Sequence, residues 1–360
     1  MLGLSGFGVV ACSEDLEGAN RRLGDVGSPS PEQGEEDAGT DLGVVEATLD
    51  LGSSDLGSFE APVVSAEALY PVAVSTQVYG VGLRHSEWGG GTTEAMDLLV
   101  DVFQPEGAPP GRPALVCIHG GGFTGGSRRA AQMLTFAEYF AERGWVAISI
   151  DYRKVQDRGT VSAAWLEYVD RLQLGNARDQ GLALYPAARD AKAAIRWLNA
   201  EAEALQLDQG YITVLGGSAG SFLAIMLGVS EPEDFRDEID LAEDPTLSST
   251  HLNQPAVVHT VIDHWGGLAH LEALEALDGR SRFDESDAPV SIVHGTQDRT
   301  VAFSEAEALR DAYMQTGVPF AFHPLEGAGH GPWSAEVNGM SLPELAFEFV
   351  VEQQALQVSR

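Results

Sequence analysis

One pentapeptide constrains the fold of this chain more than any other feature of its sequence. Gly216-Gly217-Ser218-Ala219-Gly220 joins an apolar strand-like run, 211–215, to an apolar helix-like run, 222–229, with no spare residue. A residue at the centre of such a sharp turn has a strained backbone, and side chains two positions away on either side would clash with the neighbouring strand and helix. Glycines at 216 and 220 remove that clash. The turn therefore presents the Ser218 hydroxyl at the start of a helix, where the dipole favours developing negative charge.

The chain from about residue 66 onward alternates β-rich and helical runs. This pattern predicts an α/β fold with a mostly parallel central sheet and helices on both faces, and we assign residues 63–360 to one catalytic domain. We expect strands at 72–83, 96–103, 113–118, 145–150, 211–215, 257–262, 290–293 and 320–324. We expect helices at 130–143, 186–205, 222–229, 304–316 and 345–356.

Two long stretches interrupt the alternation of strands and helices. Loops of that length in a compact domain are usually functional lids or disordered segments. Residues 155–185 contain the aromatic side chains Trp165 and Tyr168, so we predict a lid or pocket insertion there. Residues 231–254 are acidic, and we expect them to form solvated surface.

A second glycine-rich segment directly follows the buried strand at 113–118. His119-Gly120-Gly121-Gly122-Phe123 contains three consecutive glycines, whose backbone N–H groups can reach a substrate oxygen without obstruction by side chains. We predict an oxyanion hole made by the amides of Gly121, Gly122 and Ala219. His119 is expected to brace this loop. A phosphate-binding loop is disfavoured because the run lacks the Gly-Lys-Ser/Thr ending.

A serine hydroxyl needs a base, and nine histidines are available. His330 stands in Gly327-Ala328-Gly329-His330-Gly331, after the last predicted strand, and a mobile loop suits a base that serves both the serine and the leaving group. We therefore predict that His330 activates Ser218.

A third residue should orient the imidazole and stabilise its cation. Asp298 follows the buried strand at 290–293 and is our prediction for this acid. Asp263, after the preceding buried strand, is the rival, because the chain order Ser, Asp, His fits either residue. No histidine–carboxylate spacing resembles a metal-ligand set, so we expect neither a metal nor another cofactor.

Several motifs in this order resemble the α/β-hydrolase esterases, most closely the branch with hormone-sensitive-lipase-like carboxylesterases and bacterial feruloyl and acetyl-xylan esterases. The motifs are Asp101-Val102-Phe103-Gln104-Pro105, His119 to Phe123, Asp151-Tyr152-Arg153, Asp190-Ala191-Lys192-Ala193-Ala194, Gly216 to Gly220, His294-Gly295-Thr296-Gln297-Asp298 and Gly327 to Gly331. The resemblance covers about residue 95 to the C-terminus and implies a serine carboxylesterase of the α/β-hydrolase fold. Ser221, where many relatives have glycine, and the long 155–185 stretch depart from it.

The resemblance implies that Ser218 attacks an ester carbonyl and forms an acyl-enzyme, which water then hydrolyses. The substrate would be a small-molecule ester or an ester linked to a polysaccharide. We expect Phe123, Trp165, Tyr168, Trp265 and Trp333 to line its pocket. Two other functions remain open: a serine peptidase of the prolyl-oligopeptidase type, and a tethered protein with a catalytically silent hydrolase fold.

The charge of the chain restricts its partners. It has 54 acidic residues against 21 basic ones, a formal net charge of −33, and its only lysines are Lys154 and Lys192. Such a field repels nucleic acids, so no nucleic-acid partner is expected. Two explanations fit this acidity and the scarcity of lysine equally well. One is adaptation to high salt, and the other is a GC-rich genome that favours arginine over lysine, combined with an acidic tail.

The N-terminal residues, 1–62, are predicted to be a leader and linker. A short apolar run ends in Val9-Val10-Ala11-Cys12, which resembles a bacterial lipobox, and an acidic, Gly- and Ser-rich stretch follows it. We therefore expect an exported protein, lipoprotein-like or secreted, which lipidated Cys12 would tether to a membrane; a cytoplasmic location stays open because no basic residue precedes the apolar run. Cys117 lies in a buried strand, so a disulfide with Cys12 is not expected.

Overall fold

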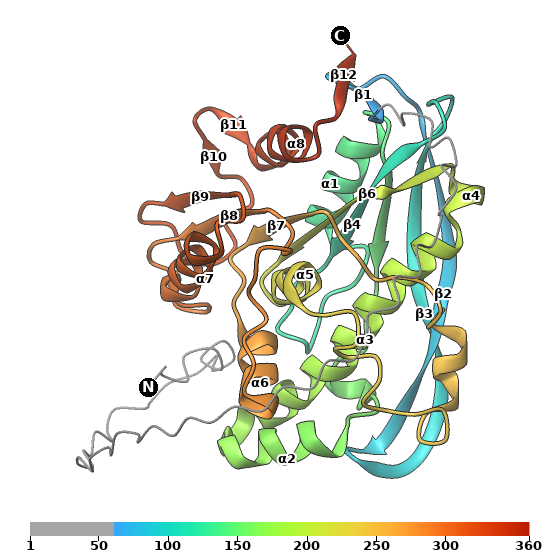
Figure 1. The fold of residues 1–360 in the computed structure, drawn as a ribbon, viewed down its shortest axis with the longest axis vertical. Coiled ribbons are helices and arrows are strands. Elements are labelled where there is room, and N and C mark those ends of the chain that lie inside the picture. Colours follow the sequence, from blue (N-terminus) through green and yellow to red (C-terminus); the bar gives the residue numbers. More distant parts are fainter. Residues whose placement is uncertain (1–60, 360) are drawn as a thin grey trace, which may run out of the picture. The chain divides into compact units, whose positions relative to one another are not determined.

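A central eight-stranded sheet organises the computed structural model, which describes residues 61–359. Its strand order is β2-β3-β5-β4-β6-β7-β8-β9, and every pair from β5 to β9 is parallel, whereas β2, β3 and β5 pair antiparallel (Figure 1). The strands are β2 (Val72–Glu87), β3 (Gly90–Pro105), β4 (Arg112–Ile118), β5 (Val146–Ile150), β6 (Leu207–Gly217), β7 (Thr260–His264), β8 (Val290–Gly295) and β9 (Phe320–Leu325). Two short pairs lie outside this sheet: β1 (Val63–Ser65) with β12 (Gln357–Ser359), and β10 (Glu336–Val337) with β11 (Met340–Ser341).

Helices cover both faces of the sheet. The helices are α1 (Ala131–Ala141), α2 (Ala163–Leu172), α3 (Arg178–Ala200), α4 (Ala202–Leu205), α5 (Ala219–Val229), α6 (Ala269–Asp278), α7 (Phe303–Thr316) and α8 (Leu342–Gln353). Side chains alternate along β4, so Val116 and Ile118 join the core under α3 and α5, whereas Leu115 and Cys117 join the core under α1 and α8. The predicted α/β-hydrolase fold is thereby confirmed.

Helix α3 begins earlier than the sequence predicted. The prediction began it at Pro186, but it begins at Arg178 and runs through the proline. A proline inside a helix costs one backbone hydrogen bond, so it usually favours a helix boundary. Burial of nearly every residue from Gly181 to Asn199 offsets that loss, so tertiary packing overrides the local signal.

The acidic stretch 231–254 is only partly the solvated surface that was predicted, because several of its residues are buried. Phe235 is fully buried and packs edge-on against Trp165 and Tyr185. The Asp234 carboxylate accepts two hydrogen bonds of 2.8 Å from the buried Arg282 guanidinium. The acidic composition did not indicate this burial, because it depends on a single aromatic residue and on the pairing of Asp234 with an arginine far away in the sequence.

The N-terminal predictions lie outside the described residues. Cys12 and its lipobox-like context fall there, so lipidation and export stay predictions. Cys117 is a free, buried thiol on β4, and burial raises its pKa. Among the helices between residues 61 and 359, none combines the length and apolarity needed to cross a bilayer.

A buried ion pair joins two of the sequence motifs, Asp151-Tyr152-Arg153 and Asp190 to Ala194. Arg153, just after β5, donates to both carboxylate oxygens of Asp190 on α3 through Nε and Nη2, the shortest distance being 2.7 Å. Its Nη1 donates to the Leu83 carbonyl of β2 at 2.9 Å. The two charged side chains are 3% and 2% exposed. Each therefore depends on the other, because a buried charge without a counter-charge is strongly destabilising.

Replacement of Asp190 by alanine should lower the free energy of unfolding by about 3–5 kcal/mol, because it leaves the Arg153 guanidinium buried without its counter-ion. Urea unfolding of the two proteins measures the difference. The matched control is Glu94→Ala, which breaks the exposed Arg84–Glu94 pair and should cost about 0–1 kcal/mol. Equal losses in the two variants would contradict this account.

Candidate active site

The turn between β6 and α5 places Ser218 at the carboxyl end of the central strand. Ser218 has φ 53° and ψ −126°, a strained conformation for a residue other than glycine. Its backbone N–H donates to the His264 carbonyl at the end of β7, 3.0 Å away. A Cβ atom at Gly220 would clash with the Ile118 carbonyl of β4, and one at Gly217 would clash with the Trp333 ring. The glycines therefore allow α5 and Trp333 to approach closely enough to frame the serine.

The loop after β9 brings His330 to this serine. The His330 Nε2 atom lies 2.9 Å from the Ser218 Oγ, and Nδ1 lies 2.7 Å from the Asp298 Oδ2. An ionised carboxylate can only accept, so Nδ1 carries the proton and Nε2 is free to accept from the hydroxyl. The imidazole is 24% exposed, which leaves its Nε2 edge accessible beside the serine.

Asp298 is held rigidly between β8 and α7. Its side chain is fully buried, and Oδ1 accepts hydrogen bonds from the backbone N–H groups of Thr300 at 2.8 Å and Val301 at 3.0 Å. Burial acts to raise the pKa of Asp298, but the hydrogen bonds from His330, Thr300 and Val301 outweigh it and lower the pKa. The carboxylate is therefore ionised when it faces the imidazole.

Asp263, the rival acid, has different partners. Its Oδ1 accepts from the Ser221 hydroxyl in the first turn of α5 and from the Gly266 N–H at 2.8 Å. The structure thus brings Asp298, and not Asp263, to His330. The sequence favoured Asp298 but left Asp263 open, because both follow buried strands of the same parallel sheet.

The glycine loop 120–122 lies beside the serine at the end of β4. Gly121 and Gly122 have φ values of 120° and 59°, which explains the need for glycine at both. Within residues 61–359 the amides of Gly121, Gly122 and Ala219 donate to no backbone carbonyl. These are the three amides that the sequence predicted as oxyanion donors.

Two side chains brace this loop. His119 is fully buried, its Nδ1 donates to the Gly120 carbonyl at 2.7 Å, and its ring stacks on Tyr152 with centroids 4.3 Å apart. Burial lowers the pKa of His119 to about 4, so it is a neutral structural imidazole. Gln180, at the start of α3, donates to the Gly122 carbonyl at 2.9 Å. Sequence reasoning missed Gln180, because nothing in its local pattern separates it from a surface glutamine.

A cavity of about 500 Å³ opens over Ser218 and His330. Of the predicted pocket residues, Trp265 and Trp333 line it, with ring centroids 4.6 Å apart. Phe123, Trp165 and Tyr168 are instead buried in the core under α3 and α5, so the structure does not bring them to this cavity. The full lining comprises Gly120, Gly121, Gly122, Thr124, Ala130, Gln132, Met133, Gln180, Gly217, Ser218, Trp265, Thr300, His330, Gly331 and Trp333.

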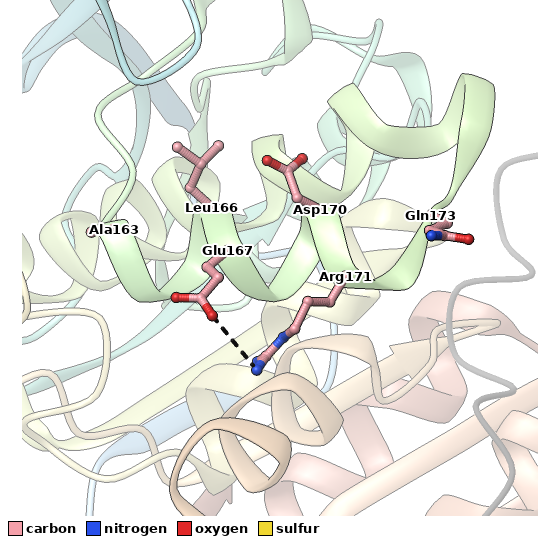
Figure 2. Close-up of a pocket in the computed structure, with 6 residues that line it drawn as sticks. All are labelled: Ala163, Leu166, Glu167, Asp170, Arg171 and Gln173. Atoms are coloured by element: carbon pink, nitrogen blue, oxygen red, sulfur yellow. Dashed lines mark ion pairs between the residues drawn. The ribbon is translucent and has the colours of Figure 1, made fainter.

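Two further hollows involve the 155–185 stretch. One, of about 400 Å³, shares Thr124 and Gln180 with the cavity over Ser218 and is otherwise lined by Val155, Gly175, Asn176, Arg178 and Asp179. The other is an open depression along α2, and Figure 2 shows its side chains Leu166, Glu167, Asp170 and Arg171 on that helix. None of the residues that line the α2 depression also lines the cavity over Ser218. Within residues 61–359 no group of three His, Cys, Asp or Glu side chains is arranged to hold a metal ion.

Known proteins with similar sequences include esterases. The family model BD-FAE matches residues 100–165 and 176–281, and the unmatched gap falls on the end of α2. Esterase LipC of Mycobacterium tuberculosis is 23% identical over 65% of this chain, and Esterase LipQ of the same organism is 23% identical over 70%. The matches cover 56% and 58% of those proteins, so the chain spans little more than half the length of the curated relatives it matches.

A similar fold is seen in a thermophilic esterase, Est2 of the planctomycete Thermogutta terrifontis. The propionate-bound structure superposes with a TM-score of 0.54 and 27% sequence identity over 78% of this chain and 94% of that one. Other structures of the same esterase contain butyrate or are phosphorylated by paraoxon.

The sheet order, the turn that carries Ser218 and these likenesses lead to one conclusion: the chain has the α/β-hydrolase fold and is similar to esterases that share it.

Proposed function

We propose that this protein hydrolyses carboxylic esters with Ser218 as the nucleophile. The observation that carries the proposal is the continuous hydrogen-bonded chain from the Ser218 Oγ through His330 to the buried Asp298, at the wall of a cavity that also contains the glycine loop. The esterase relatives support the same reaction class.

In the first half of the reaction, the Ser218 Oγ attacks the ester carbonyl while the His330 Nε2 accepts its proton. The carbonyl oxygen becomes an oxyanion, and the amides of Gly121, Gly122 and Ala219 would stabilise it. Asp298 keeps the imidazole in the reactive tautomer and stabilises its cation. His330 then gives the proton to the leaving alcohol, and Ser218 keeps the acyl group.

In the second half, water replaces the alcohol. His330 accepts a proton from this water, the resulting hydroxide attacks the acyl carbon, and the carboxylic acid leaves as the proton returns to the Ser218 Oγ. No group beyond these side chains and amides is needed for either half.

Substitution of Ser218 by alanine should reduce hydrolysis of p-nitrophenyl acetate by about three or more orders of magnitude, because the nucleophile is lost. The fold should persist, because alanine keeps the Cβ atom that Ser218 already carries in this backbone conformation. Steady-state kinetics and circular dichroism measure the two properties.

A fluorophosphonate probe, followed by mass spectrometry, provides the companion measurement and should label Ser218 in the wild-type protein alone. Undiminished hydrolysis by the variant would overturn the proposal. Failure on esters together with cleavage of a proline-containing peptide would favour the peptidase alternative.

The cavity also suggests a class of ester. Its walls at Met133, Trp265 and Trp333 are apolar and suit a small apolar group, and the related esterase Est2 has been seen with propionate and butyrate. The second hollow is lined by the polar side chains of Asn176, Arg178 and Asp179, and Gln180 lines both this hollow and the cavity over Ser218. We therefore propose esters with a short apolar part and a hydroxyl-rich part, such as acetylated sugars.

A bulky side chain in the second hollow should lower activity on an acetylated sugar but not on a simple alkyl ester. Asn176→Trp should lower kcat/KM for an acetylated sugar by about tenfold or more, as expected when a bulky side chain excludes part of a substrate, and leave ethyl acetate within about twofold. Glu167→Trp, on the separate α2 depression of Figure 2, is the matched control and should change neither rate. An equal decline for both esters would argue against the two-part pocket.

A further inference from the structure

Residues that line the second hollow hold the glycine loop in place. Three of them donate hydrogen bonds, of 3.1, 2.9 and 2.9 Å, to consecutive backbone carbonyl groups: Thr124 through Oγ1 to Gly121, Gln180 through Nε2 to Gly122, and Val155 through its backbone N–H to Phe123. The loop that carries two of the predicted oxyanion donors is therefore fixed by contacts from this hollow.

Contacts to these carbonyl groups also set the direction of the loop amides. In a planar trans peptide the C=O and N–H groups point in opposite directions, so the Thr124 bond to the Gly121 carbonyl orients the N–H of Gly122. The same bond polarises that N–H, because hydrogen bonds in a chain strengthen one another. Gly122 has φ 59° and no side chain to restrict it, and Gln180 holds the peptide on its other side. Gln180 thus limits the rotation that would turn an oxyanion donor away.

The Gln180 side chain has a second polar atom that the protein does not use. A backbone carbonyl can only accept, so the amide nitrogen faces Gly122 and Oε1 points away from it. Within residues 61–359 this Oε1 accepts no hydrogen bond. The side chain is half-buried and lines both the second hollow and the cavity over Ser218. Gln180 therefore offers an acceptor at the boundary between the two.

The charges beside this acceptor favour a neutral donor. The Arg178 guanidinium lies 2.6 Å from the Asp170 Oδ1 and 3.6 Å from the Asp179 Oδ1, so two carboxylates already face its single positive charge. A hydroxyl group can donate a hydrogen bond to Oε1, whereas an ionised carboxylate cannot. The second hollow therefore suits the hydroxyl groups of a sugar-like alcohol part.

We propose that Gln180 is a positioning residue that couples the second hollow to the oxyanion hole. A hydroxyl of the substrate's alcohol part donates to Oε1 and immobilises the amide whose Nε2 holds Gly122. Hydroxyl-bearing esters then gain mainly in kcat, because the bond aligns a group that is needed most in the transition state. The inference rests on the proposed roles of Ser218 and of the glycine-loop amides.

Two substrates separate this coupling from simple binding. One is a monoacetylated glucose, and the other is the same ester with its free hydroxyls methylated, which keeps the sugar ring but can donate no hydrogen bond. The wild-type protein should hydrolyse the free sugar ester with a kcat about threefold or more above that of the methylated ester, as expected for one neutral hydrogen bond. Equal kcat values in the wild-type protein would overturn the proposal.

Gln180→Met nearly keeps the length of the side chain and removes both polar atoms. Its kcat should fall about tenfold for the free sugar ester but only about threefold for the methylated ester, because the first loses two hydrogen bonds and the second loses one. KM should stay within about threefold for both esters. If Gln180 only supported the fold, kcat would fall equally for both, and that result would contradict the coupling.

Gln180→Glu tests the contact to Gly122 within a single variant. The ionised side chain cannot donate to the Gly122 carbonyl, but the protonated one can. The preference for the free sugar ester should therefore be lost near neutral pH and return as the pH falls toward the ordinary glutamate pKa of about 4.3. The ratio of the two kcat values at each pH cancels the titration of His330, which affects both esters. A ratio that does not change with pH would count against the proposal.

Gln209→Met is the matched control, because the Gln209 Nε2 donates to the Asn199 carbonyl at 2.8 Å, a bond of the same kind near the other end of α3. It should leave both kcat values unchanged. If the wild-type Ser218 is neither labelled by a fluorophosphonate nor active on any ester, the proposed function itself fails. That result is distinct from equal losses on the two esters in an active Gln180 variant.

Discussion

The close approach of three backbones at the Ser218 turn is the constraint on which the site depends. Strand β6 ends beside β4, and α5 begins so near that only glycine fits at position 220. This contact fixes the strained serine at the carboxyl edge of a parallel sheet, where the loops after β4, β7, β8 and β9 converge. The glycine loop, Trp265, Asp298 and His330 reach Ser218 from those loops, so the site is assembled by the topology of the sheet.

Several of the few basic side chains of this acidic protein are buried inside the domain. The chain has only 21 basic residues, yet the structure buries six of them: Arg112, Arg153, Arg189, Lys192, Arg196 and Arg282. Arg153 and Arg282 pair with buried aspartates, and Lys192 donates to the Glu231 carbonyl while burial lowers its pKa to about 8. Eight acidic residues are buried as well, so folding withdraws charge of both signs from the surface: Asp101, Asp190, Asp234, Asp244, Asp263, Asp287, Asp298 and Glu305.

The two long stretches show where sequence reasoning reaches its limit. Residues 155–185 do contribute to the pockets, but through Val155, Asn176, Arg178 and Gln180 and not through Trp165 or Tyr168. The aromatic side chains are large enough to be drawn into the core, where Phe235 from the acidic stretch meets them. The local sequence does not indicate the burial of Trp165 or of Phe235, because each residue is buried by a segment some 70 residues away in the chain.

The sequence alone determined the parts of this protein that are written in consecutive residues. Alternating strands and helices gave the fold class, and the glycines around Ser218 and at 120–122 identified the turn and the loop, because backbone geometry there permits little else. Only the tertiary structure decided which aspartate faces His330, which aromatic residues line the cavity, and that Gln180 holds the glycine loop. Those outcomes depend on which strand ends are neighbours in the sheet and on which side chains pack in the core. Both are contacts between residues far apart in the chain, so the local sequence does not specify them.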